Sequence, residues 1–221
     1  MSAPQAEVKH NEGKGQETEN FKFTRDWLKP HLHYLEKALS CLKNRKINVL
    51  EIGAFEGRST TWILEELCKD PESKLITIDI FVKIFPDNDN EATFHENIKK
   101  THKERQIEVI KIKSFDALIN LNHEKKMSFD FIYIDGSHES HDVLSDAILS
   151  WNLLKEGGIM ILDDYEWDFF EEEYLNPRIA IDSFLKYYQA QIELIYKRFQ
   201  VAIRKVIKDY TQTIRDDKTI P

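Results

Sequence analysis

The chain has 221 residues, a length that accommodates one α/β domain with a full hydrophobic core. Hydrophobic residues make up 41% of the chain and charged residues 32%, a balance that is typical of a globular protein in water. The formal net charge of −8 disfavours a nucleic acid or an anionic membrane as partner, because binding to phosphates requires a basic surface.

Targeting signals and cysteines predict the compartment. No apolar run reaches the ~18 residues that a membrane-spanning helix needs, so we expect no membrane partner. The N-terminus lacks a basic stretch followed by an apolar one, so we expect no secretory signal. We interpret Cys41 and Cys68, which form no C-x-x-C spacing, as buried thiols in a reducing compartment. These features together predict a cytoplasmic protein.

The first 46 residues divide into a tail and a helical segment. Residues 1–20 hold one large aliphatic side chain, Val8, and we expect them to be a disordered tail. Within residues 21–46 a helix is expected to begin near Pro30, because proline suits a first helical turn. Four leucines share one face of that helix: Leu32, Leu35, Leu39 and Leu42. The face predicts packing on the domain, with a homodimer contact as the alternative.

Residues 47–60 predict a buried strand, a glycine turn and the start of a helix. Gly53 and Gly57 follow a short apolar run, and helical spacing resumes after Arg58 or Ser59. Such a turn lets a ligand approach the backbone at a helix N-terminus, whereas the alternative is a turn that only packs the helix. Phe55 occupies the position of the second glycine of the dinucleotide fingerprint, which disfavours a nicotinamide oxidoreductase. The pattern instead resembles the first motif of class I S-adenosylmethionine (SAM) methyltransferases.

Strands and helices alternate through the rest of the chain. This order predicts a doubly wound, mostly parallel sheet inside one domain at 47–210, followed by a frayed terminus at 211–221. Only two residues separate the last two strands, which must therefore form a hairpin with one antiparallel strand. The expected strands are 74–79, 107–112, 128–135, 159–163, 192–196 and 199–206; the expected helices are 91–105, one from Ser114, 140–154 and 177–189; and a turn is expected at 155–158.

Acidic residues end three of the predicted strands. Asp79 ends the second strand, Asp135 the fourth, and Asp163-Asp164 the fifth. The fourth and fifth strands should be neighbours about 5 Å apart, so their acids should converge and repel one another. A hard divalent cation such as Mg²⁺ resolves that repulsion, although single carboxylates could also serve as helix caps. Zinc is disfavoured because no second histidine or cysteine has ligand spacing there.

The span from about Phe23 to Val206 resembles methyltransferase family 24, the macrocin and sugar O-methyltransferases. The matching pieces are VLEIGAFEGRST, FDFIYIDGSHESHDVLSDA, LLKEGGIMILDDY and FQVAIRK. The resemblance implies a Rossmann-like seven-stranded sheet of order 3-2-1-4-5-7-6. It also implies that Asp79 binds the SAM ribose and that His138 is the catalytic base. Magnesium would be held by Asp135, Asp163 and Asp164; Asp163 departs from the family, which often has glutamate there.

The resemblance implies a cofactor site formed by Glu51, Gly53, Phe55, Gly57, Ser59, Asp79, Ser114 and Asp135. The segment 163–176 carries seven acids without Lys or Arg, interleaved with aromatic residues. It predicts either a solvated acidic loop or a substrate lid, and a lid of this charge would disfavour anionic substrates.

We therefore expect a Mg²⁺- and SAM-dependent O-methyltransferase that acts on a hydroxyl of a small molecule, such as a sugar or polyol. The residues 135–138 lack the D/N-P-P-aromatic motif of nucleic-acid amino methyltransferases, and neither cysteine follows a proline. Two alternatives remain: a SAM-binding domain with other chemistry, such as the cephalosporin hydroxylase-like relatives, and a non-catalytic SAM-binding or protein-interaction module.

Overall fold

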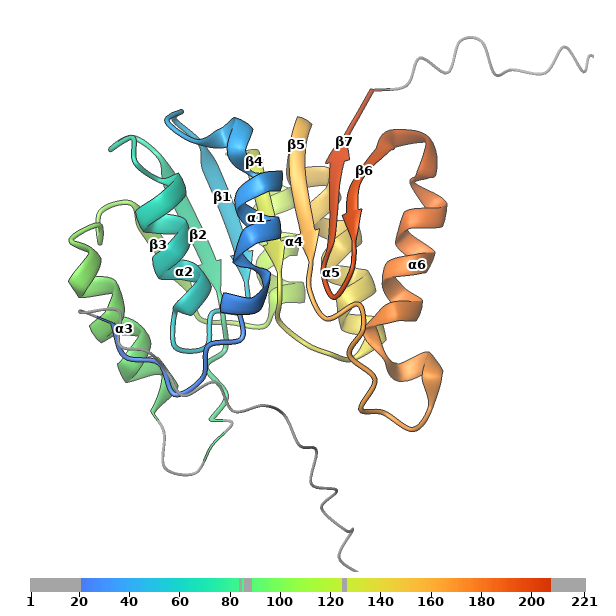
Figure 1. Cartoon of the computed structure of the whole chain (residues 1–221), viewed down its shortest axis with the longest axis horizontal. Coiled ribbons are helices and arrows are strands. Elements are labelled where there is room, and N and C mark those ends of the chain that lie inside the picture. The colour runs from blue at the N-terminus through green and yellow to red at the C-terminus, as the bar shows by residue number, and fades with distance from the viewer. Residues whose placement is uncertain (1–20, 84, 86–88, 125–126, 208–221) are drawn as a thin grey trace, which may run out of the picture.

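The structure, a computed structural model, describes residues 21–83, 85, 89–124 and 127–207. Seven strands form one sheet in the order β3-β2-β1-β4-β5-β7-β6, which confirms the predicted topology (Figure 1). β7 pairs antiparallel with both β5 and β6, and all other pairs are parallel. The strands are β1 Asn48–Ile52, β2 Lys74–Ile78, β3 Ile107–Ile110, β4 Phe129–Ile134, β5 Leu154–Leu162, β6 Ile192–Lys197 and β7 Val201–Lys205.

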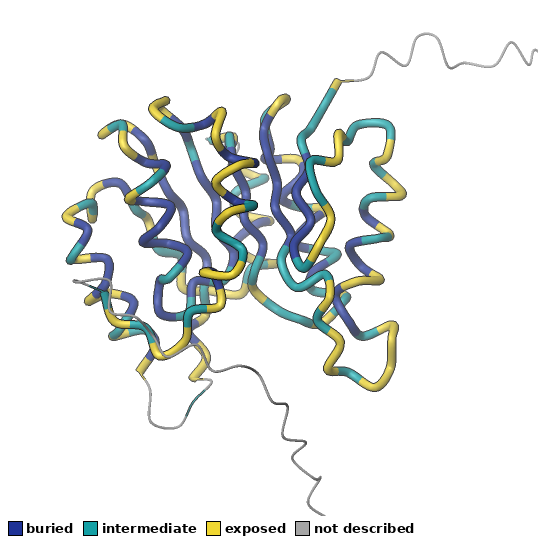
Figure 2. The backbone as a smooth tube through the Cα atoms, viewed as in Figure 1, coloured by how far each residue is buried: buried dark blue, intermediate teal, exposed yellow. Residues whose placement is uncertain are grey.

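Helices cover both faces of the sheet. α1 (Leu32–Ala38), α2 (Arg58–Trp62) and α3 (Asn90–Thr101) lie on one face (Figure 1). α4 (Ser114–Glu124), α5 (Ser140–Leu153) and α6 (Pro177–Tyr187) lie on the other. Alternate residues of the central strands point to opposite faces, so each strand contributes to two cores. Figure 2 shows the resulting buried sheet between partly exposed helices.

The two cores divide adjacent strand residues between them. Val49 and Ile159 belong to the core under α1 to α3, whereas Leu50 and Met160 belong to the core under α4 to α6. Three of the four predicted leucines are buried in the first core: Leu35 of α1, Leu39 directly after α1, and Leu42 of the following 3₁₀ turn (Ser40–Leu42). A homodimer contact through this helix therefore stays a prediction.

Three predicted features need correction. α3 ends at Thr101 rather than 105, because His102 adopts a left-handed φ of 55° that stops the helix. The expected turn at 155–158 lies inside β5, where Phe129 pairs with Leu154 but Phe131 pairs with Ile159, so four residues of β5 bulge out. Cys41 is exposed, although Cys68 is buried as expected. The predicted helix after the glycine turn is confirmed as α2, which continues as a π-helical turn at Ile63–Leu67.

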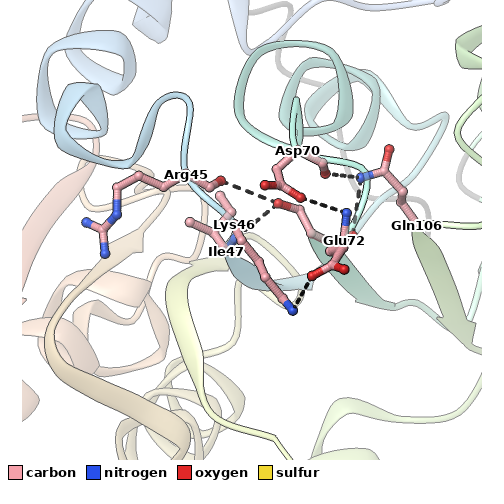
Figure 3. A network of polar contacts seen from close by, with 7 residues as sticks. Arg45, Lys46, Ile47, Asp70, Glu72 and Gln106 are labelled. Carbon is pink, nitrogen blue, oxygen red and sulfur yellow. Dashed lines mark hydrogen bonds and ion pairs between the residues drawn. The ribbon is translucent and has the colours of Figure 1, made fainter.

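Polar contacts join the segments that precede β1, β2 and β3, at the end of the sheet opposite the predicted site (Figure 3). Ile47 donates its backbone N–H to Ser73 Oγ at 3.0 Å, and Gln106 Nε2 donates to the carbonyl of Asp70 at 2.8 Å. Lys46 and Glu72 form an exposed ion pair at 2.7 Å. These contacts connect the starts of β1, β2 and β3, whereas the predicted site residues follow the carboxyl ends of the strands.

No helix of the described ranges has both the length and the apolar character to cross a bilayer. The predicted tail at 1–20 and frayed end at 211–221 lie outside the described residues.

Candidate active site

The predicted site residues form a row along the carboxyl edge of the parallel strands. Gly53, Asp79, Asp135 and Asp163 each directly follow a strand. Backbone hydrogen bonds continue the ladder through them: Gly53 N–H donates to Ile78 O at 2.9 Å, Asp135 N–H to Ile52 O at 2.8 Å and Asp163 N–H to Ile134 O at 2.9 Å. Ligands of open α/β sheets bind at this edge, so the structure brings the predicted residues together where a cofactor would bind.

Only glycine fits at position 53, because the loops that follow β1 and β4 are in close contact there. It has a φ of +87°, and an added Cβ would lie 1.8 Å from the carbonyl oxygen of Asp135. No side chain fits between the loop after β1 and the loop after β4. The glycine therefore lets the loop after β1 (residues 53–57, the predicted cofactor loop) and the loop after β4 (residues 135–139) pack directly on each other.

Glu51 lies beneath the cofactor loop instead of lining it. Its side chain is fully buried, and its carboxylate accepts hydrogen bonds from the hydroxyls of Ser59, Thr60 and Thr77, each at 2.6 Å. Burial raises the pKa of Glu51 to about 7, against the opposing effect of these three hydroxyls. The Glu51 carboxylate and the Ser59 hydroxyl therefore join β1, β2 and α2 under the loop, and a role of Glu51 and Ser59 in cofactor binding stays a prediction.

Asp79 holds the cofactor loop through its carboxylate. Oδ2 accepts the backbone N–H groups of Ala54 at 2.7 Å and Phe55 at 2.9 Å, and Oδ1 accepts that of Phe81 at 2.5 Å. Phe55 and Phe81 both have left-handed backbone conformations, with φ of 49° and 53°, which bulky residues rarely adopt. A carboxylate offers about four acceptor sites, so these three bonds leave about one site of Asp79 for a ribose, whereas the resemblance implies contact with both ribose hydroxyls.

Asp163 is oriented by a buried network. Its Oδ2 accepts hydrogen bonds from the Tyr133 hydroxyl and, at 2.8 Å, from Gln200 Nε2. Its Oδ1 accepts the backbone N–H of Asp164 at 2.8 Å. Burial and the negative charge of Asp164 raise the pKa of Asp163 to about 6. Tyr133 lies in β4 and Gln200 precedes β7, so this acid is held from both neighbouring strands.

His138 lies against Asp164 and an aromatic ring. Its Nδ1 is 2.8 Å from Asp164 Oδ2, without the direction of a hydrogen bond, and Trp167 stacks on its ring at 4.8 Å. Burial lowers the pKa of His138, but the carboxylates of Asp164 and Asp163 outweigh burial and raise it overall. The ring thus lies between Asp164, which follows β5, and Trp167 of the acidic loop 163–176.

The three predicted metal ligands share an edge without forming a tight cluster. Burial and the charges of Asp163 and Asp164 raise the pKa of Asp135 well above its usual range. Within the described residues, three metal-ligating groups within 4.8 Å of one another occur only at Glu139, His141 and Asp142. That Asp135, Asp163 and Asp164 bind one divalent cation therefore stays a prediction. The donor chemistry still fits Mg²⁺, which takes one or two carboxylates and completes its shell with waters.

The N-terminal segment 21–31 runs along this edge, at the lower end of the sheet in Figure 1, and contacts the loop after β1 and the start of α2. Thr24 donates its N–H and its hydroxyl to the Glu56 carboxylate at 2.6 and 2.9 Å. Asp26 pairs with Arg58 at 3.0 Å, and the Trp27 ring lies 5.4 Å from that of Phe55. Sequence analysis placed only a helix in this region and missed its contact with the loop.

Several aromatic residues of the acidic loop take different directions. Trp167 contacts Phe169 and Phe170 at ring distances of 5.0 and 5.1 Å, beside His138. Tyr165 instead packs under Lys197, whose Nζ lies 4.4 Å from the ring centroid. Ser140 donates to the carbonyl of Tyr174 at 2.6 Å, which attaches the loop to the start of α5. The loop thus has anchors at both ends around a Trp167 cluster.

Ser114 and Gly57 have more local roles. Gly57 precedes α2 with a φ of 82°, and an added Cβ would lie 3.0 Å from the Phe94 ring. Ser114 begins α4 beyond β3, is partly exposed and hydrogen-bonds the Asp146 carboxyl through its side chain, so its predicted contact with the cofactor stays a prediction. Tyr133 and Gln200 were missed, although a lone glutamine in the apolar run FQVAI is a signal for a buried polar contact.

The reversed seventh strand, the glycine loop after β1 and the acids after β2, β4 and β5 define a class I SAM-dependent methyltransferase domain. The chain belongs to methyltransferase family 24: that family's model, described as a methyltransferase domain, matches residues 50–165, just over half of the chain.

Known proteins are similar to different extents. The chain is 27% identical over 138 residues to Uncharacterized protein R132 of Acanthamoeba polyphaga mimivirus, covering 62% of this chain and 59% of that protein. MycE methyltransferase of the mycinamycin biosynthetic pathway, solved with Mg, SAH and mycinamycin VI, has a TM-score of 0.60 and 18% identity, covering 92% of this chain and 54% of MycE. An O-methyltransferase from Bacillus cereus in complex with SAH has a TM-score of 0.61 and 19% identity, covering 83% and 84%. The chain therefore spans less than two thirds of the first two relatives.

Proposed function

We propose that this protein transfers the methyl group of SAM to a hydroxyl of a small molecule with the help of a divalent cation, in the cytoplasm. The observation that carries the proposal is the row of Gly53, Asp79, Asp135 and Asp163 at one sheet edge in a family 24 domain. MycE, of the same fold, was solved with Mg and SAH, which supports both the cofactor and the metal as candidates.

The chain's own residues divide the chemistry. The loop at 53–57 would bind SAM through its backbone at the start of α2. The Asp79 carboxylate fixes the shape of this loop by accepting two of its backbone N–H groups. A divalent cation between Asp135 and the acids after β5 would stabilise negative charge on the acceptor oxygen. His138 would take the hydroxyl proton. Its ring lies next to Asp164, beside the proposed metal site, and stacking on Trp167 orients it. Asp163 would keep its orientation through Tyr133 and Gln200.

The acidic loop supports a neutral or cationic acceptor. Asp164, Glu166 and Asp168 lie close in sequence to His138's stacking partner Trp167, so an anionic acceptor would meet repulsion. Aromatic faces beside the acids suit a ring-shaped acceptor, which buries apolar C–H groups against them.

The test combines binding and turnover. Thermal denaturation is measured with SAM, S-adenosylhomocysteine, NAD and MgCl₂; SAM at 100 times its dissociation constant should stabilise the fold by about 2.7 kcal/mol, and NAD should not. Release of S-adenosylhomocysteine is then measured over hydroxyl acceptors with MgCl₂ or EDTA. Binding of SAM without metal-dependent turnover would support the alternative of a non-catalytic SAM-binding module.

A further inference from the structure

The acidic loop 163–176 ends at a buried asparagine that pairs with the backbone of the same loop. Asn176 is only 6% exposed. Its Oδ1 accepts the backbone N–H of Phe170 at 3.1 Å, and its Nδ2 donates to the carbonyl oxygen of Phe170 at 2.9 Å. One side chain thereby satisfies both backbone polar groups of Phe170, as a neighbouring strand would. Asn176 directly precedes α6, whose Ala180 and Phe184 are buried in the second core, so this clamp is attached to a fixed element.

Two further backbone contacts hold the same loop. Near its start, the N–H of Tyr165 donates to the carbonyl oxygen of Phe199 at 2.7 Å. Near its end, the hydroxyl of Ser140 donates to the carbonyl oxygen of Tyr174 at 2.6 Å. The partners belong to the turn between β6 and β7 and to the start of α5, so the loop is bonded to three separate elements. A loop that swings as a lid would have to break these bonds and both bonds of the Asn176 clamp.

A chain of ring contacts connects the clamp to His138. Phe170 packs against Trp167 with ring centroids 5.1 Å apart, and Trp167 stacks on His138 at 4.8 Å with an interplanar angle of 30°. The backbone N–H of Trp167 also donates to the carbonyl oxygen of Asp164 at 3.0 Å, which folds the loop back toward the acids after β5. The position of the His138 ring therefore depends on where Phe170 holds the Trp167 indole.

We propose that Asn176 is a positioning residue that fixes the acidic loop as a preformed wall of the acceptor site. Through Phe170 and Trp167, the clamp sets the orientation of the His138 ring. The inference rests on the proposed function only for the role of His138, because the wall itself is defined by the contacts of the loop. The loop already lies against His138 in this arrangement, so the binding of an acceptor requires no lid closure.

NMR tests the contact chain without SAM, metal or acceptor. Protein labelled with 5-fluorotryptophan gives one fluorine line for each of its four tryptophans, and Trp167→Phe assigns the line of Trp167. Asn176→Ala should move this line toward the position of free 5-fluorotryptophan, because the indole leaves the surrounding rings. The ring signal of His138 in histidine-labelled protein, assigned with His138→Ala, should move in the same variant. The lines of the buried Trp62 and Trp151 should stay in place, which shows that the fold is intact.

Asn122→Ala is the matched control, because Asn122 also holds backbone groups with its side-chain amide. Its Nδ2 donates to the carbonyl oxygens of Leu118 at 2.8 Å and Leu149 at 3.0 Å, which joins α4 to α5 outside the acidic loop. Asn122→Ala should therefore destabilise the protein in urea about as much as Asn176→Ala and leave the Trp167 line in place. Asn176→Asp keeps an acceptor and lacks the donor, so its Trp167 line should lie between those of wild type and Asn176→Ala.

Limited digestion with Glu-C protease measures whether the loop opens. This protease cleaves after glutamate, and the loop exposes three consecutive glutamates, Glu171 to Glu173. Cleavage requires local opening, so wild type and Asn122→Ala should resist cleavage at these positions, and Asn176→Ala should be cut at least tenfold faster. A lid that swings freely would be cut as fast in wild type as in Asn176→Ala, and that result would overturn the preformed wall.

Turnover connects the wall with the chemistry. It is measured with the hydroxyl compound that reacts fastest in the acceptor assay described above. Asn176→Ala should lower kcat by ~10–100-fold, because a misplacement of about 1 Å at a reacting group costs a factor of this order. The dissociation constant of SAM should stay within twofold of wild type, since the side-chain hydrogen bonds of Asn176 all lie within the acidic loop. Asn122→Ala should keep kcat within threefold.

The outcomes separate the inference from the proposed function. Unmoved Trp167 and His138 signals in Asn176→Ala would overturn the clamp, whatever the protein methylates. A moved Trp167 line with an unmoved His138 signal, or with kcat equal to that of wild type, would overturn the positioning of His138. Absence of SAM binding or of turnover in wild type would contradict the proposed function instead, and the NMR and digestion results would still decide on the wall and on the orientation of His138.

Discussion

Tyr133 of β4 donates its hydroxyl hydrogen to Asp163 at the end of β5, and the two residues are thereby joined across neighbouring strands. Gln200 completes the contact from the β7 side, and Tyr196 donates to Gln200 Oε1 at 3.2 Å. The acid beside the proposed metal site is thus oriented by three residues that come from three different segments. Groups that orient metal ligands commonly set the metal affinity.

Tyr133→Phe should weaken Mg²⁺ or Mn²⁺ binding by ~10–100-fold, because it removes the hydroxyl that orients Asp163 and keeps the packed ring. Folding should lose only about 1 kcal/mol, since Gln200 still donates to the same oxygen. Calorimetric titration of the metal into the S-adenosylhomocysteine complex measures the effect. Tyr174→Phe, at an exposed tyrosine of the acidic loop, is the control. Equal metal affinity in Tyr133→Phe and wild type would show that Asp163 needs no support from Tyr133.

Gly53→Ala should prevent stable folding or cost more than about 3 kcal/mol. The added methyl would meet the Asp135 carbonyl at 1.8 Å, and backbone atoms cannot move away without breaking the β1–β4 ladder. Gly157→Ala is a matched control, because Gly157 also has a positive φ of +74° but has open space around it. It should cost only the ~1–3 kcal/mol of a left-handed non-glycine residue. Urea denaturation compares the two variants, and similar losses would mean that the contact with Asp135 is unimportant.

Most of the fold was predictable because its signals are local. Apolar strand runs, helical spacing and the two-residue gap before β7 are all properties of adjacent residues, and they defined seven strands in the correct order once the resemblance was added. The bulge at 155–158 was missed because Gly157-Gly158 is typical of a turn in sequence, whereas only pairing with β4 shows that the strand continues.

The site was predictable in its positions and less so in its contacts. Acids at strand ends are visible in the sequence, so Asp79, Asp135, Asp163 and Asp164 were found. The burial of Glu51 under three hydroxyls and the support of Asp163 by Tyr133 and Gln200 depend on which strands pair. The stacking of the His31 ring on Phe199 gave no local signal either, because the two residues are 168 positions apart in the chain.

Glu51 should make folding stability depend on pH. Its pKa in the folded protein, about 7, exceeds the ordinary glutamate value of 4.5, so the unfolded chain releases the proton first as pH rises. The contribution is full below pH 4.5 and is lost as pH rises to 7, a change of roughly 3 kcal/mol. Glu51→Gln removes this titration. Urea denaturation at pH 5 and 7.5 should therefore show a steeper loss of stability in wild type than in Glu51→Gln.

Asp146, whose pKa burial also raises to about 7, acts in the same direction in both proteins. The comparison of Glu51→Gln with wild type removes its effect. Parallel stability profiles for the two proteins would contradict a raised pKa for Glu51.

Asp79→Ala should lower SAM affinity at least tenfold. The change removes the acceptor of three backbone N–H groups, including those of Phe55 and Phe81 in left-handed conformations, so the cofactor loop loses its shape. Hydrogen bonds to a charged group contribute ~1.5–3 kcal/mol each, so loss of the ribose contact would add to this effect. Calorimetry with SAM is the measurement, and Asp79→Asn, which keeps one acceptor oxygen, should lose less. Unchanged SAM affinity in Asp79→Ala would contradict both roles.

His138→Ala should lower kcat by ~10²–10⁴ while SAM and Mg²⁺ still bind. The His138 imidazole lies beside Asp164 and can accept a proton near neutral pH. Asp163, whose pKa burial raises to about 6, is a weaker candidate, because both of its oxygens already accept hydrogen bonds. The alternative is that the ring only supports Asp164.

The pH profile separates the two roles: loss of a proton acceptor removes the acidic limb of kcat, whereas loss of support for Asp164 weakens metal binding and leaves that limb in place. Turnover is therefore measured against pH at saturating SAM and Mg²⁺, with the exposed His141→Ala as control. Near-normal kcat with an unchanged pH profile in His138→Ala would remove this residue from proton transfer.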